Sequence, residues 1–148
     1  MNRFMLVMLC LAGMTVAFSG CGRELPEAGQ EVNAPAGKEI RVYYFHRTAR
    51  CHSCLKIESL SEETVKTFFP VELENGAVTW RSINLDDAGN AHFVEDYDLS
   101  TQTVIVAEYS GGQQLRWKNL DKVWELLDAD VEFSQYVESE IRAWTADS

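Results

Sequence analysis

Two cysteines three positions apart, Cys51 and Cys54, are the residues of this sequence best suited to chemistry. They follow an apolar run over residues 40–46 and precede a stretch with helical spacing that begins at Leu55. A Cys-x-x-Cys pair between a strand and the start of a helix is typical of dithiol redox sites. The unpaired N–H groups and the dipole of a helix start stabilise a thiolate, which is the form of cysteine that attacks disulfides or binds metal ions.

The neighbours of the pair leave three functions open. Arg50, and His52 when it is protonated, favour a Cys51 thiolate and therefore a redox role. Cys51 and Cys54 together with either His46 or His52 form a soft ligand set that suits Cu(I) or Zn(II), so a metal-binding module is the alternative. A plain disulfide without turnover, in an exported interaction domain, is the third possibility, although so short a loop removes little chain entropy.

The elements around the pair predict an α/β domain with a central mixed sheet of about four strands flanked by helices. The first strand, residues 40–46, is apolar on both faces, as in the middle of a covered sheet. A helix over 55–69 follows, with a second N-cap at 61–64 that predicts a kink, and Pro70 ends it. The remaining predicted elements are strands at 78–84, 102–109 and 114–118, and helices at 91–97, 119–128 and 131–144.

The first 38 residues predict export and a membrane tether. Residues 1–20 have a short positive start and an apolar run typical of a signal peptide. Residues 17–21 resemble a bacterial lipobox, in which Cys21 becomes lipidated; an uncleaved anchor helix is the alternative. Residues 21–38 are a proline- and glycine-containing linker, and 39–148 form the domain. We therefore expect a lipid-anchored protein of the bacterial cell envelope, on its periplasmic side.

The charge of the chain excludes some partners. With 13 Lys and Arg against 23 Asp and Glu, the formal net charge is −10. A nucleic-acid partner is not expected, because phosphate binding depends on clustered Lys and Arg. The expected partner is an exported protein with a dithiol or a disulfide, and no cofactor is expected unless the pair binds Cu(I) or Zn. Glu58, one helical turn after Cys54, is either a solvated surface residue or a proton relay.

The order of elements and the site motif resemble known proteins. From Ile40 to Trp144 the pattern resembles the thioredoxin fold. The segments Tyr-Tyr-Phe-His at 43–46, Arg-Cys-x-x-Cys at 50–54 and Ile-Glu at 57–58 resemble small exported bacterial proteins of the nitrophenyl-compound nitroreductase subunit ArsF family. The resemblance implies a thioredoxin-like domain in which Cys51 is the nucleophile and Cys54 the resolving thiol.

Two departures from thioredoxins concern the surroundings of the pair. Thioredoxins place a cis-Pro in the loop that faces the dithiol, and Gln102 occupies that position here. Since a cis bond before a residue other than Pro costs about 2.5–4 kcal/mol, we expect a trans bond. Thioredoxins also carry a buried Asp six residues before the first cysteine, where this chain has Phe45. With Arg50 and His52 beside Cys51, we expect the Cys51–Cys54 couple to have a higher, more oxidising reduction potential than thioredoxin, whose potential is about −270 mV.

Overall fold

The computed structural model of the chain describes residues 37–146. The predicted signal peptide, the lipidation of Cys21 and the predicted linker up to residue 36 therefore lie outside the described residues. Among the residues described, no helix is both long enough and apolar enough to cross a membrane.

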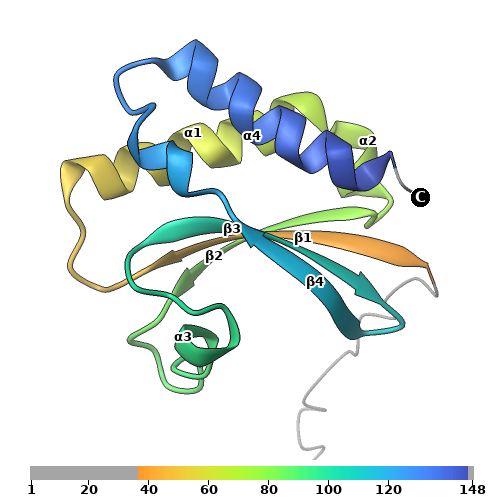
Figure 1. Cartoon of the computed structure of the whole chain (residues 1–148), viewed down its shortest axis with the longest axis horizontal. Coiled ribbons are helices and arrows are strands. Elements are labelled where there is room, and N and C mark those ends of the chain that lie inside the picture. Colours follow the sequence, from red (N-terminus) through yellow and green to blue (C-terminus); the bar gives the residue numbers. More distant parts are fainter. Residues whose placement is uncertain (1–36, 147–148) are drawn as a thin grey trace, which may run out of the picture. The chain divides into compact units, whose positions relative to one another are not determined.

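Within residues 37–146, the centre of the fold is a four-stranded mixed sheet in the order β2-β1-β3-β4 (Figure 1). β1 runs parallel to β2 and antiparallel to β3, and β3 and β4 form an antiparallel hairpin. The strands are β1 Lys38–His46, β2 Val78–Asn84, β3 Thr103–Ser110 and β4 Gln113–Asn119. Because β1 has neighbours on both sides and is buried along most of its length, the prediction of a central, covered strand is confirmed.

Helices cover the two faces of the sheet unequally. α1 and α4 lie together on one face, and the short α3 lies on the other (Figure 1). The helical elements are α1 His52–Phe68, α2 Pro70–Glu74, α3 Phe93–Asp96, the 3-10 turn η1 Asp121–Trp124 and α4 Asp130–Thr145. An aliphatic core joins the sheet to α1 and α4, and a smaller aromatic core joins it to α3.

Two predicted helices differ from those observed. α1 begins at His52 rather than at Leu55 and continues without a break through residues 61–64, so the predicted second N-cap there is wrong. Ser61 is fully buried inside α1 and does not act as a cap. Of the predicted helix over 119–128, only the 3-10 turn η1 forms. Pro70 does end α1 as predicted. It is also the first residue of the short α2, a position that suits its fixed φ angle.

Candidate redox site

The dithiol pair lies at the N-terminus of α1, at the end of the loop that leaves β1. Cys51 and Cys54 form a disulfide with their Cα atoms 5.1 Å apart. Cys51 is the N-cap of α1, because its backbone is extended (φ −88°, ψ 168°) and its Sγ accepts a hydrogen bond from the Cys54 N–H at 3.2 Å. The predicted place of the pair at a helix start is confirmed.

The two sulfurs have different environments. Cys51 is exposed, whereas Cys54 is only 3% exposed. An exposed cysteine whose sulfur caps a helix N-terminus is accessible to a partner and, once reduced, is stabilised as a thiolate. The arrangement therefore gives the pair one reachable atom and one protected atom.

Tyr44 connects the start of α1 to the loop before β3, and Trp124 of η1 holds the same loop. The Tyr44 hydroxyl donates a hydrogen bond to the Cys54 carbonyl at 2.8 Å and lies 3.5 Å from Gln102 Oε1. The Trp124 indole N–H donates to the Gln102 carbonyl at 2.9 Å. Burial raises the pKa of the Tyr44 hydroxyl, and the charge of Arg50 opposes this shift. Gln102 is thus held near the dithiol helix. No peptide bond within residues 37–146 is cis, so the bond before Gln102 is trans as expected.

Phe45 does not face the dithiol. Successive residues of a strand point to opposite faces, and Phe45 packs into the aromatic core on the α3 side. Tyr44, its neighbour in sequence, belongs to the α1 side and reaches Cys54. Counting six residues back from Cys51 therefore selects the wrong face of β1, and sequence analysis missed the tyrosine that contacts the helix of the pair.

Arg50 is paired with a carboxylate. Its guanidinium forms an ion pair with Glu58 of α1, and the Ser82 hydroxyl of β2 donates a hydrogen bond to the same carboxylate. The Arg50 guanidinium carbon also lies 5.9 Å from the centre of the Tyr44 ring. Glu58 is accordingly not the solvated surface residue of one sequence interpretation, since only 20% of its side chain is exposed. His52 is the first residue of α1 and is exposed.

His46 ends β1 and is nearly buried. Its Nδ1 lies 2.9 Å from the Arg47 carbonyl oxygen, which only accepts hydrogen bonds, so Nδ1 carries the hydrogen. The ring stacks on Tyr44 with 5.8 Å between ring centres. The His46 ring therefore packs against Tyr44 and helps to fix its position.

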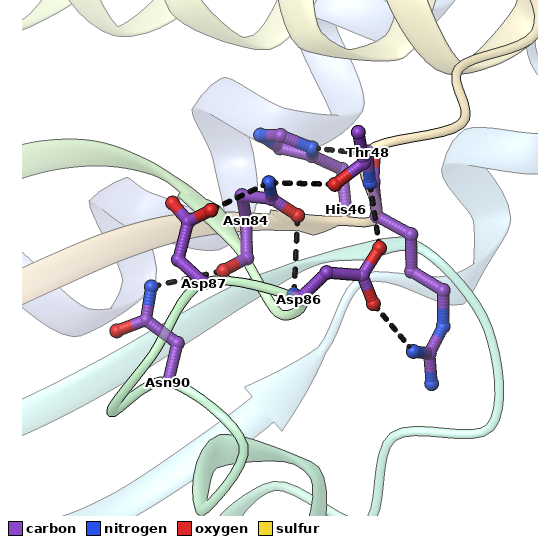
Figure 2. Close-up of polar contacts among 7 residues, drawn as sticks. His46, Thr48, Asn84, Asp86, Asp87 and Asn90 are labelled. Atoms are coloured by element: carbon purple, nitrogen blue, oxygen red, sulfur yellow. Dashed lines mark hydrogen bonds and ion pairs between the residues drawn. The ribbon is translucent and has the colours of Figure 1, made fainter.

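A polar network fixes the loop between β1 and the pair to the end of β2 (Figure 2). Asp86 accepts hydrogen bonds from Arg47 Nη1 at 2.9 Å and from the Thr48 N–H at 2.8 Å. The Asn84 amide donates to Thr48 Oγ1 at 3.0 Å and to Asp87 Oδ1 at 2.9 Å. The Thr48 N–H, with help from Arg47, lowers the pKa of the Asp86 carboxyl below its ordinary value. These contacts fix the approach of the chain to Cys51.

Residues 37–146 contain no group of three or more His, Cys, Asp and Glu side chains placed to hold a metal ion. The Cu(I) or Zn alternative for Cys51, Cys54 and His46 or His52 stays a prediction.

Comparisons with known proteins concern the fold. No protein-family model matches the chain, and no curated protein is significantly similar to it. Among solved structures, thioredoxin O2 from Arabidopsis thaliana is 19% identical with a TM-score of 0.40, over 65% of this chain and 76% of that one. The thioredoxin of Malassezia sympodialis is 17% identical with a TM-score of 0.39, over 67% and 80% of the two chains.

The strand order and directions, with a Cys-x-x-Cys disulfide at the N-terminus of α1, define the class of this domain. It is a thioredoxin-like domain with a mixed four-stranded sheet flanked by helices. The fold class predicted from the sequence is confirmed.

Proposed function

We propose that this chain is a membrane-anchored, exported thioredoxin-like protein that acts as a thiol–disulfide oxidoreductase, or as the redox partner of another exported protein. The observation that carries the proposal is the asymmetry of the pair. Cys51 is an exposed residue whose sulfur caps the N-terminus of α1, while Cys54, its disulfide partner, is buried. An attacking thiol needs exposure and thiolate character, and a resolving thiol needs only to reach its neighbour.

The reaction follows from these positions. The reduced Cys51 thiolate attacks one sulfur of a partner disulfide, a Cys51–partner bond forms, and the other partner sulfur leaves as a thiolate. The Cys54 thiol then gives its proton to the partner thiolate released first and attacks Cys51 Sγ, which closes the Cys51–Cys54 disulfide and releases the second partner thiolate. The partner gains two electrons and the pair loses two. The reverse sequence oxidises a partner dithiol.

The loop that faces the pair bears on which partners fit. Gln102 presents an amide side chain beside the dithiol helix, and its backbone is held by Trp124. In this proposal Arg50 and His52 influence the thiolate, and Gln102 meets the bound partner. Lipidation of Cys21, the periplasmic location and membership of the ArsF family belong to the same proposal. They are supported by the signal-like residues 1–21 and by the motif residues 43–46, 50–54 and 57–58.

Trapping of partners tests this function. In cells that produce the full chain, a Cys54→Ser variant is expected to accumulate mixed disulfides through Cys51, because the resolving thiol is missing. A Cys51→Ser variant is the matched control and should trap none. Purified reduced protein should also reduce a disulfide-bonded test peptide. If neither variant traps a partner and the peptide stays oxidised, the proposal is wrong; thiols that stay reduced and retain copper or zinc through gel filtration would favour the metal-binding alternative instead.

The membrane anchor is tested separately. In fractionated cells, the wild-type chain should sediment with membranes, and a Cys21→Ser variant should lose lipid labelling and retain its precursor mobility. Unchanged lipid labelling of that variant would contradict the anchor without affecting the redox proposal.

A further inference from the structure

The charge next to the dithiol, that of Arg50, is balanced by a residue of α1 eight positions further along the chain. Arg50 immediately precedes Cys51, and by sequence alone its cation is expected to stabilise the Cys51 thiolate. The structure turns this guanidinium to Glu58, one helical turn beyond Cys54. Both side chains are largely shielded from water, with 23% of Arg50 and 20% of Glu58 exposed. Screening by solvent is therefore weaker than for a surface ion pair.

Two further contacts hold the Arg50–Glu58 ion pair in this arrangement. Ser82 on β2 donates a hydrogen bond to Glu58, so the carboxylate is fixed between the helix and the sheet. The guanidinium lies near the face of the Tyr44 ring, and its Nε is buried without a hydrogen-bond partner. Within residues 37–146, Arg50 forms its ion pair with Glu58 and makes no hydrogen bond to either sulfur.

We propose that Glu58 is a positioning residue for the redox pair: by holding Arg50, it keeps the Cys51–Cys54 disulfide less oxidising than the Arg-Cys-x-x-Cys motif alone would make it. This inference rests on the proposed function and names how that same site is regulated. Glu58 acts through Arg50 and contacts neither sulfur.

The direction of the effect follows from the half-reaction. Reduction of the disulfide takes up two electrons and one proton and yields the Cys54 thiol and the Cys51 thiolate; a small dithiol such as dithiothreitol supplies them and becomes a disulfide. The negative charge exists only in the reduced form. A freed Arg50 cation would therefore stabilise the reduced form and make the disulfide a stronger oxidant. An Arg50 held by Glu58 contributes less of this stabilisation.

The test is the redox equilibrium of a Glu58→Gln variant. Full-length protein is equilibrated with graded ratios of a reduced and an oxidised small thiol, alkylated, and analysed by mass spectrometry of the peptide that contains Cys51 and Cys54. The equilibrium constant is expected to shift on the order of tenfold toward the reduced pair, the effect of one freed charge in a partly shielded site. For a two-electron couple this equals about 30 mV.

The matched control removes the same charge from the same helix. Glu62 lies one turn after Glu58 and pairs with Lys66 in a more exposed position. A Glu62→Gln variant should leave the equilibrium within about twofold of the wild type, since exposed pairs couple weakly to their surroundings. A Ser82→Ala variant, which keeps all charges, should shift it in the same direction as Glu58→Gln and by less.

A double-mutant cycle decides whether Glu58 acts through Arg50. In an Arg50→Gln background, the Glu58→Gln shift should be largely abolished. An equal shift in both backgrounds, or no shift in either, would overturn the inference. The redox equilibrium is measured without a protein partner. If Glu58→Gln shifts the equilibrium as expected but no partner is trapped, only the proposed function is rejected. If a partner is trapped but Glu58→Gln leaves the equilibrium unchanged, only the role of Glu58 is rejected. Circular dichroism shows whether each variant has folded.

Discussion

The two faces of the sheet are packed with different side chains, although β1 supplies residues to both. On the α1 and α4 side the core is mainly aliphatic and adjoins the dithiol pair. On the α3 side, aromatic rings pack at centre distances of 5.1 to 6.1 Å, among them Phe45, Phe93 and Tyr97. The alternation of β1 decides which of the neighbours Tyr44 and Phe45 meets the pair. One face of the sheet therefore adjoins the disulfide, and the other packs against α3.

Removing an aromatic ring from the α3 side should have the largest effect on stability. Phe45→Ala deletes a fully buried ring that packs against Tyr43, Phe93 and Tyr97. We expect a loss of about 3–5 kcal/mol in the free energy of unfolding, measured by chemical denaturation. The redox equilibrium of the folded fraction should stay as in the wild type. A clear shift in that equilibrium would show that the two faces are not functionally separate.

A single hydroxyl on the α1 side should have an intermediate effect. Tyr44→Phe removes the hydrogen bond to the Cys54 carbonyl, with an expected cost of about 1–2 kcal/mol. Because this bond fixes the backbone of Cys54, the reduced Cys54 thiol should also be alkylated faster. Tyr97→Phe is the matched control on the other face, since it removes a hydroxyl that lies 2.9 Å from the Tyr109 hydroxyl. Equal alkylation rates in the two variants would refute the difference between the faces.

The smallest expected effect is a gain in stability on the α1 side. The Ser61 hydroxyl is buried in the middle of α1 and has no hydrogen-bond partner among the described residues. Ser61→Ala removes this unsatisfied group and has a better helix propensity, so we expect a stabilisation of about 1 kcal/mol. Thermal and denaturant unfolding would measure it. Destabilisation would mean that the hydroxyl has a favourable partner after all.

The sequence was most informative where one signal dominated. The apolar run at 40–46 identified the central strand, and the two strands predicted at 102–109 and 114–118 are joined by Gly111 and Gly112, whose positive φ angles suit a hairpin turn. The Cys-x-x-Cys spacing placed the pair at a helix start. In each case, local residue types were enough to specify the local structure.

The sequence was less informative where distant residues compete for one group. Nothing in the spacing showed that Glu58 takes the Arg50 cation, because the contact also depends on Ser82 from another strand. Which face of β1 adjoins the pair could not be derived from the spacing either: Tyr44 reaches the Cys54 carbonyl, and Phe45 packs on the opposite side. The 119–128 segment has a helical composition, but only a single 3-10 turn forms there. In that turn the Trp124 side chain donates a hydrogen bond to Gln102, a contact between distant residues that composition does not reveal.

The place of β1 in the sheet has a consequence for the order of folding. It is the first strand in the described chain, yet it lies between β2 and β3, which follow it along the chain. Its register with β3 joins Lys38 to Ser110 and Phe45 to Thr103, so its second neighbour exists only after most of the chain has been made. Pairings of such long range form slowly compared with a hairpin. We therefore expect the surroundings of the dithiol to be completed late in folding, with both thiols accessible to other oxidants until then.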